Sequence, residues 1–173
     1  TTYTAHGSDH ARQPGDIIEL SCDRPLAIRD IYVNQEIVPE YHKFEITFDL
    51  DGRWENPFDP EEVQVDGLFT TPDGRELVVP GFFYQDYERT TRNGEDYFEP
   101  LGSPEWKIRF SPSRVGIYSY RIKVVNQGEE MVTGIDTLSC RTGSMNHGFI
   151  RISKKNPLYF EYDDGTPFFA IAN

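Results

Sequence analysis

The feature that most constrains the fold of this chain is a series of short segments in which apolar and polar residues alternate. In residues 44–50, four apolar side chains alternate with Glu45, Thr47 and Asp49. Successive side chains of a β-strand point to opposite faces, so this pattern predicts a strand with one face on a core and the other in water. Amphipathic helical periodicity of any length is absent from the sequence. We therefore predict an all-β chain.

The same alternation recurs along the chain, and Gly, Pro, Asn and Asp punctuate it. Further strands are expected within residues 17–22, 31–33, 63–69, 77–79, 106–110, 118–124 and 133–142. Turns are predicted at residues 71–74, 93–94 and 126–128, and the first of them makes 77–79 the hairpin partner of 63–69. About ten short strands with this punctuation predict an antiparallel β-sandwich.

The spacing in residues 116–120, Gly-Ile-Tyr-Ser-Tyr, resembles the tyrosine corner of immunoglobulin-like sandwiches. Tyr120 stands where an antibody domain carries its second cysteine. Cys22 and Cys140 do not stand where that inter-sheet bridge needs them, so the match is one of architecture. The two cysteines either form one bridge from the N-terminal arm to a late strand or remain two buried thiols.

Breaks in the pattern predict three regions. Residues 1–16 have no periodicity and are expected to be a mobile leader, residues 17–142 form the sandwich, and residues 143–173 form a connector with a C-terminal β-hairpin around Asp163–Gly165. The chain begins with Thr1 rather than Met, so we expect that processing or cloning has removed the true start.

Charge narrows the class of partner. The chain has 17 Lys and Arg against 29 Asp and Glu, for a formal net charge of -12. Phosphate binding relies on clustered Lys and Arg, so this balance argues against nucleic acid and anionic membrane as partners. No run of 18 apolar residues and no signal peptide is present. Neutral glycans, basic surfaces and cations remain open, and we expect no cofactor.

The stretch at residues 80–92 is interpreted as a loop that leaves the second arm of the hairpin, and it is the main candidate for a binding site. It sets four aromatic rings beside acids and bases, and a ring face can cover the C–H face of a pyranose while charged groups meet its hydroxyls. The alternative is that Phe82 and Phe83 close a sheet edge and the tyrosines pack over it. The candidate carbohydrate or domain-contact residues are Trp54, Tyr84, Asp86, Tyr87 and Arg89.

The two tryptophans are expected to differ. Trp106 opens an alternating strand and is predicted to lie in the core, whereas Trp54 lies in a polar turn where we expect an exposed ring.

Metal binding and catalysis are not favoured. Asp49, Asp51 and Asp59 crowd oxygen donors into one segment and are weak candidates for Ca²⁺, but the spacing of an EF-hand loop is missing, so solvated turn acids are favoured. No acid sits in a recognisable catalytic motif, and no G-x-S-x-G elbow occurs. We expect His42 and His147 to be structural or solvated.

Several motifs in order resemble one family. These are residues 38–50 (VPEYHKFEITFDL), 56–60 (NPFDP), 79–87 (VPGFFYQDY) and the Trp106-Lys107 and Arg109-Phe110 pairs. They resemble the DUF5060 family, the immunoglobulin-like domain that precedes the catalytic (β/α)8 barrel in bacterial glycoside hydrolases. Residues 148–169 look like the connector that runs into the barrel of those enzymes. The resemblance covers residues 37–173, and residues 1–36 depart from it.

The resemblance implies a non-catalytic β-sandwich packed on a sugar-cleaving barrel, and we expect this domain to support the barrel and extend its substrate cleft. The sequence does not establish the localisation, although an extracellular or periplasmic one is weakly favoured. A (β/α)8 barrel needs about 200 residues or more, so we interpret the chain as a fragment without its catalytic domain. Two alternatives stay open. One is an independent carbohydrate-binding module that uses Trp54, Tyr84 and Tyr87, and the other is a cell-surface structural domain stabilised by Ca²⁺.

Overall fold

A computed structural model describes residues 26–143 and 145–170, and within these ranges the chain is built from strands without any helix. It follows that no helix of these ranges is long and apolar enough to cross a membrane. The strands are β1 (Ala27–Val33), β2 (Ile37–Pro39), β3 (Phe44–Asp51), β4 (Val63–Thr70), β5 (Glu76–Pro80), β6 (Phe82–Arg92), β7 (Glu95–Phe110), β8 (Gly116–Asn126), β9 (Glu129–Val132), β10 (Asp136–Arg141), β11 (Ile150–Ile152), β12 (Phe160–Tyr162) and β13 (Pro167–Phe168).

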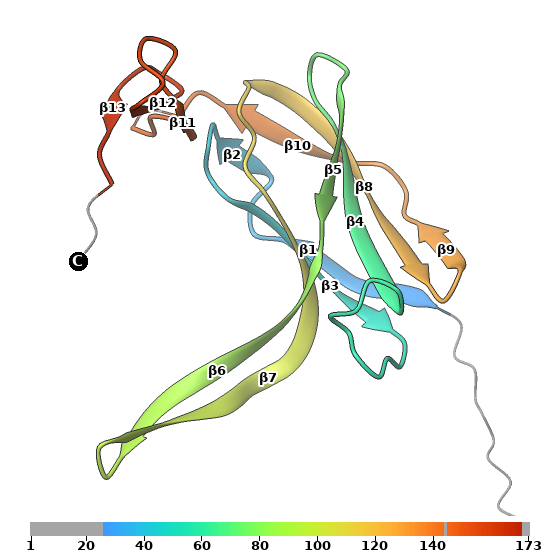
Figure 1. The fold of residues 1–173 in the computed structure, drawn as a ribbon. Coiled ribbons are helices and arrows are strands. Elements are labelled where there is room, and N and C mark those ends of the chain that lie inside the picture. Colours follow the sequence, from blue (N-terminus) through green and yellow to red (C-terminus); the bar gives the residue numbers. More distant parts are fainter. Residues whose placement is uncertain (1–25, 144, 171–173) are drawn as a thin grey trace, which may run out of the picture.

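Two sheets form the body of the molecule (Figure 1). One has four strands in the order β1-β3-β7-β6, and the other has the order β2-β10-β8-β4-β5 with β9 paired to β8. All pairs are antiparallel except β2 with β10, which is parallel. The antiparallel sandwich predicted from the alternation is therefore confirmed, with one short parallel pair added.

The core lies between these two sheets and is built from the inward positions of the alternating strands. Phe44, Ile46 and Phe48 of β3 are buried, and so is every second residue of β8 from Tyr118 to Val124. Across the sheets, Phe69 stacks on Phe110 at a centroid distance of 4.3 Å. Each fully buried side chain of this size stabilises the fold by about 1.5–3 kcal/mol, so these rows account for much of the cohesion between the sheets.

The tyrosine corner anticipated from residues 116–120 is present. The hydroxyl of Tyr118 accepts a hydrogen bond from the backbone N–H of Arg114 and donates one to the Arg114 carbonyl, both at 3.1 Å. Tyr120 is buried and its hydroxyl donates to Asp136 Oδ2 at 3.0 Å. The bonds between the Tyr118 hydroxyl and the backbone of Arg114, in the loop before the strand, are the feature by which immunoglobulin-like sandwiches fix that corner.

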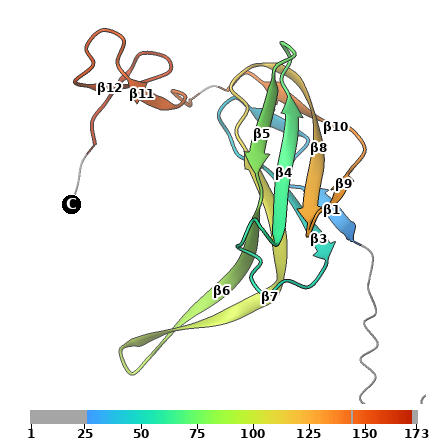
Figure 2. The same cartoon turned by 45° about the vertical axis from the view of Figure 1, so that its right-hand side comes forward.

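The interpretation of residues 80–92 as a loop is wrong. Residues 82–92 form β6, which pairs with β7 along its length to make a hairpin that projects from the sandwich as a two-stranded ribbon (Figures 1 and 2). The turn at Asn93 and Gly94 is as predicted, and both residues have positive φ, as a type I′ turn requires. The outer part of the ribbon is exposed on both faces, so its sequence lacks the apolar alternation of a strand that covers a core.

The C-terminal strands β11, β12 and β13 form a separate small sheet, set apart from the sandwich in both views (Figures 1 and 2). β12 and β13 pair around the turn at Asp163–Gly165, so the C-terminal hairpin is present. The predicted leader, the strand at residues 17–22 and Cys22 lie outside the described residues. Cys140 is buried, the two alternatives of a bridge to Cys22 or two buried thiols stay open, and the domain boundaries stay a prediction.

Candidate functional site

The register of the four-stranded sheet places a group of polar and aromatic side chains on the face turned away from the core. Glu45 pairs with Arg109 across β3 and β7, and Tyr84 pairs with Glu105 across β6 and β7. Their neighbours Ile46, Ile108 and Trp106 point into the core, so these side chains point outward. We call this group the outer-face cluster, and it consists of Tyr32, Lys43, Glu45, Phe82, Tyr84, Glu105, Lys107 and Arg109.

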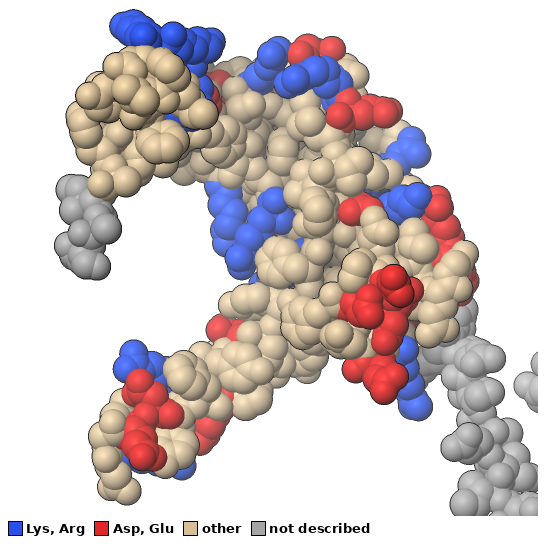
Figure 3. Space-filling view, viewed as in Figure 1, with Lys and Arg blue, Asp and Glu red and all other residues tan. Residues whose placement is uncertain are grey.

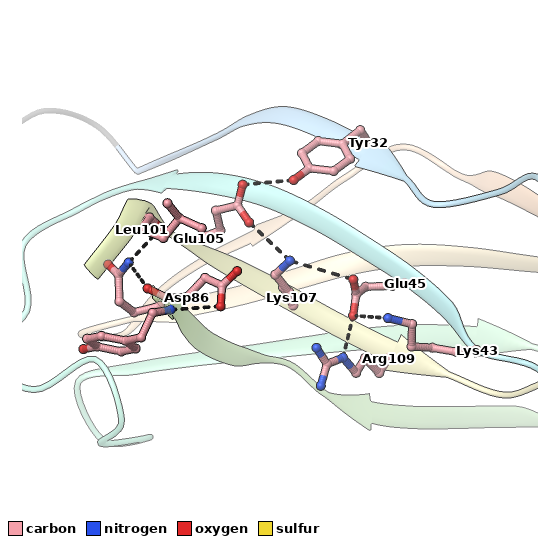
Figure 4. A network of polar contacts seen from close by, with 10 residues as sticks. Tyr32, Lys43, Glu45, Asp86, Leu101, Glu105, Lys107 and Arg109 are labelled. Atoms are coloured by element: carbon pink, nitrogen blue, oxygen red, sulfur yellow. Dashed lines mark hydrogen bonds and ion pairs between the residues drawn. The ribbon is translucent and has the colours of Figure 1, made fainter. Parts of the chain in front are cut away.

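A chain of hydrogen bonds and ion pairs runs through the outer-face cluster (Figure 4). The Tyr32 hydroxyl donates to Glu105 Oε1 at 2.9 Å, and Lys107 Nζ lies 3.2 Å from Glu105 Oε2. Lys107 Nζ also lies 3.8 Å from Glu45 Oε1. The side chains of Lys107 and Glu45 are each only 12% exposed, so this pair is much better shielded than an ordinary surface ion pair.

Glu45 collects the largest number of partners in the cluster. Arg109 Nε and Lys43 Nζ both donate to Glu45 Oε2. Burial raises the pKa of the Glu45 carboxyl, but the hydrogen bonds from Arg109 and Lys43 and the charges of Arg109 and Lys107 lower it by more. The pKa of Glu45 therefore lies below its usual range, and the carboxylate is charged at neutral pH.

Two of the three aromatic rings of the cluster, those of Phe82 and Tyr84, already have a cation close to them. Lys107 Nζ lies 4.6 Å from the centroid of the Tyr84 ring, and the Arg109 guanidinium lies 4.9 Å from that of Phe82. Such cation–π contacts contribute about 0.5–2 kcal/mol each. Arg109 also lies 5.7 Å from the centroid of the Tyr84 ring, so Tyr84, a predicted contact residue, is half-buried among these neighbours.

The other candidates on β6 do not share one face. The pairing with β7 is irregular between Tyr84 and Asp86, and beyond that point Tyr87 and Arg89 lie on one face of the ribbon while Asp86 lies on the other. Asp86 Oδ1 accepts the backbone N–H of Tyr87 at 2.9 Å, and Arg89 bonds to Asp96 Oδ2 at 2.7 Å. Tyr87 is 51% exposed, so its ring is the most accessible of this group.

The expectation that the Trp54 ring is exposed is wrong, because the ring packs against the core. Its Nε1 donates to Asn126 Oδ1 at 2.9 Å, and its ring meets Trp106 edge-on at 5.7 Å between centroids. Trp106 is 4% exposed and lies in the core, as predicted. The Trp106 ring also packs on Phe83, whose side chain points to the face opposite that of Tyr84. Trp54 and Tyr84 therefore lie on opposite faces of the four-stranded sheet, which the polarity of a turn sequence does not reveal.

Two of the three acids named as weak Ca²⁺ candidates have other partners. Asp51 Oδ2 pairs with Arg29 at 2.5 Å, Asp59 Oδ1 accepts the N–H of Glu61 at 2.9 Å, and Asp49 is exposed. Across residues 26–143 and 145–170, no group of three His, Cys, Asp or Glu side chains is placed to hold a metal ion.

The histidines and the acids of the outer-face cluster also have structural partners. His42 Nδ1 lies 3.0 Å from the Glu40 carbonyl, and His147 Nδ1 lies 2.7 Å from Asp164 Oδ2. Glu45 and Glu105 both pair with Lys107. Glu45, Lys107 and Arg109 were not among the site residues predicted from the sequence, although their outward positions follow from the alternation of their strands.

Comparison with known proteins gives two findings. A family model described as "Domain of unknown function (DUF5060)" matches residues 37–125. Among solved structures, the crystal structure of a "putative glycoside hydrolase" from Bacteroides vulgatus ATCC 8482 is similar, with a TM-score of 0.51 and 21% sequence identity. The likeness covers 78% of this chain and 22% of that chain. No curated protein matches the sequence. At this identity the likeness supports the fold, and the chain spans about a fifth of the length of that structure.

Proposed function

Because the chain belongs to the DUF5060 family, a family of domains of unknown function, we propose that it is a non-catalytic accessory domain of a glycoside hydrolase. In this proposal the sandwich supports a catalytic (β/α)8 barrel of the same polypeptide. One observation carries the proposal, namely the uncovered apolar face of the C-terminal sheet.

That face follows from the register of β11, β12 and β13. Ile152 pairs with Phe160, and Phe160 pairs with Phe168, so these three side chains share one face. On the other face Arg151 Nη2 lies 3.0 Å from Glu161 Oε1, and Glu161 is 7% exposed. The charged groups of the polar face thus pair with each other. On the apolar face, Ile152 is 62% and Phe160 is 50% exposed.

A sheet of two- and three-residue strands is too small to be stable by itself, and it needs a partner that covers its apolar face. Exposed apolar patches of this kind mark interaction sites. The similar structure from Bacteroides vulgatus supports a partner within the same polypeptide, because the part of it that resembles this chain is 22% of its length. We assign the catalytic barrel to this position.

The β6–β7 ribbon gives the domain a second point of contact. Figure 3 shows a hollow between the C-terminal strands and the ribbon, and a catalytic domain seated there would meet both. Tyr87 and Phe98 are 51% and 62% exposed on the ribbon, and rings of this kind suit the wall of a glycan cleft. In the proposal the ribbon extends the substrate cleft, with Tyr87 and Arg89 toward the substrate or the barrel.

The independent carbohydrate-binding module considered above is less well supported. It requires Trp54, Tyr84 and Tyr87 to form one surface, and Trp54 lies on the opposite face of the sheet from Tyr84. The Trp54 ring is also committed to Trp106 and Asn126.

The nucleotide sequence that follows the codon for Asn173 tests the proposal. We expect the reading frame to continue for about 200 residues or more, with strand and helix segments that alternate and carboxylates at strand ends. The 173-residue chain alone should then release no reducing sugar from any polysaccharide that the parent enzyme cleaves. A stop codon directly after Asn173, or hydrolysis by this chain alone, would overturn the proposal.

A further inference from the structure

A groove at the base of the β6–β7 ribbon shares Phe82 with the outer-face cluster and no residue with the C-terminal sheet. Its volume is about 390 Å³, within the usual range for a small-ligand site. Phe58 and Phe83 supply aromatic walls, Trp106 lies at its floor, and Gln64 and Asp66 bring polar groups. Phe58 belongs to the sequence motif at residues 56–60, but no binding role was predicted from the sequence for Phe58, Gln64 or Asp66.

Phe58 is presented to solvent by a tightly bonded loop. Glu62 Oε2 accepts the backbone N–H groups of Glu55 and Asn56 at 2.8 and 3.2 Å, and Asn56 Oδ1 accepts that of Phe58 at 3.1 Å. The Phe58 ring nevertheless stays 72% exposed and touches Phe83 only edge-on, at 5.7 Å between centroids. These bonds therefore hold the backbone that carries the exposed ring, which lowers the entropy that the loop loses when a ligand stacks on the ring.

Asp66 supplies the polar end of the groove. The residue is only 7% exposed, although it carries a carboxylate. Gln64 Nε2 donates to Asp66 Oδ2 at 2.7 Å, and within the described ranges this is the one hydrogen bond to that carboxylate. A shielded carboxylate gains from further donors, because each oxygen accepts more than one hydrogen bond.

We propose that this groove is a binding subsite for a neutral pyranose unit of a glycan. The Phe58 ring covers the C–H face of the sugar, hydroxyls donate to Asp66, and the exposed amide of Gln64 serves a further hydroxyl. Asp66 is the charged side chain that lines the groove, so a uronate or a sulfated sugar would be repelled. The subsite adds a binding role to the proposed accessory one and does not depend on the docking of the C-terminal sheet.

Saturation-transfer NMR on the 173-residue chain tests the subsite, with cellohexaose, xylohexaose, mannohexaose and laminarihexaose as neutral probes and hexagalacturonate as the acidic one. We expect transfer to at least one neutral probe and none to hexagalacturonate. Phe58→Ala should abolish the transfer without unfolding the chain, because the ring lies largely outside the core. Asp66→Asn should weaken binding by about tenfold, the effect of losing hydrogen bonds to a charged group.

Ile117→Ala is the matched control, because Ile117 is 68% exposed, close to the 72% of Phe58, and does not line the groove. It should leave the transfer unchanged. The inference is overturned if no neutral probe shows transfer, if transfer survives Phe58→Ala, or if hexagalacturonate binds instead. If saturation transfer is observed but the C-terminal sheet does not dock on a catalytic domain, the accessory role is overturned and the subsite stands. If the sheet docks but no transfer is observed, the subsite is overturned and the accessory role stands.

Discussion

Glu45 is the residue on which most polar contacts of the outer face depend. Its carboxylate meets Arg109, Lys43 and Lys107 while its side chain is only 12% exposed. These partners stabilise the charged carboxylate more than burial disfavours it, and this holds its pKa below the ordinary value of 4.5. Ionised Glu45 therefore stabilises the folded chain, because the folded state keeps the proton off where the unfolded state accepts it.

We predict that this contribution is complete above pH 4.5 and is lost as the pH falls through the lowered pKa of the folded state. Glu45→Gln should lower the free energy of unfolding by about 1–2 kcal/mol at pH 7, as expected for charge-assisted hydrogen bonds that are partly open to solvent. Urea unfolding at pH 7 and at pH 3 measures this, and the difference from the native chain should shrink at pH 3. A difference that is equal at both pH values would contradict the role assigned to the carboxylate.

Tyr118 fixes the tyrosine corner through its hydroxyl group. Its ring is 1% exposed, and its hydroxyl satisfies both the N–H and the carbonyl of Arg114. Tyr118→Phe removes the hydroxyl and leaves both backbone groups without this partner, so the free energy of unfolding should fall by about 1–3 kcal/mol. Thermal or urea unfolding checks this, with Tyr87→Phe on the exposed ribbon as the control that should change little. Equal effects of the two substitutions would argue against the corner as a stabilising feature.

Residues with a local signature were predictable, and residues placed by tertiary contacts were not. The tyrosine corner and the burial of Trp106 follow from spacing and alternation within a few residues. Trp54 sits in a polar turn, and its half-buried position depends on Asn126, which is distant in sequence. Its environment therefore carries no local signal.

At the scale of elements, the crossing from β5 to β6 carries the chain from one sheet to the other within a few residues. Gly81 lies at this crossing, and its N–H donates to the Val65 carbonyl at 2.7 Å. A Cβ atom there would lie 2.5 Å from Val65 Cγ1, closer than packed carbon atoms approach. The crossing therefore requires glycine because of space.

We predict that Gly81→Ala lowers the free energy of unfolding by about 1–3 kcal/mol through overpacking against Val65. Gly134→Ala is the matched control, because a Cβ atom at Gly134 meets no atom within 4 Å. Urea denaturation of the two variants measures the contrast. Equal stability of both variants would show that the crossing tolerates a side chain.

The strands that cover the core could be predicted from the sequence, whereas the strands of the β6–β7 ribbon could not. β3 and β8 alternate because one face is buried, and this alternation is visible in the sequence. In β6 beyond Gln85 both faces are exposed, so aromatic and charged residues occupy either face without a period. Only the turn at Asn93–Gly94 signalled that the two arms pair.

At the scale of the whole molecule, three surfaces differ in the side chains that they expose. The outer-face cluster is closed by its own ion pairs, the C-terminal sheet exposes an apolar face, and the groove beside Phe58 holds an open polar end. The sandwich was foreseeable from strand alternation, and the family from its motifs. The apolar face depends on the pairing of three very short strands, and the sequence shows them only as apolar runs.

In the proposed arrangement, the apolar face of β11, β12 and β13 is covered by a catalytic domain of the same polypeptide. Hydrogen–deuterium exchange of these strands can be compared between the 173-residue chain and the parent polypeptide that is proposed to carry the catalytic domain. We predict at least about tenfold slower exchange of Ile150–Ile152 and Phe160–Tyr162 in the parent, because covered strands open less often. The double substitution Ile152→Ser and Phe160→Ser should abolish the difference. Equal exchange in the chain alone and in the unsubstituted parent would contradict the account.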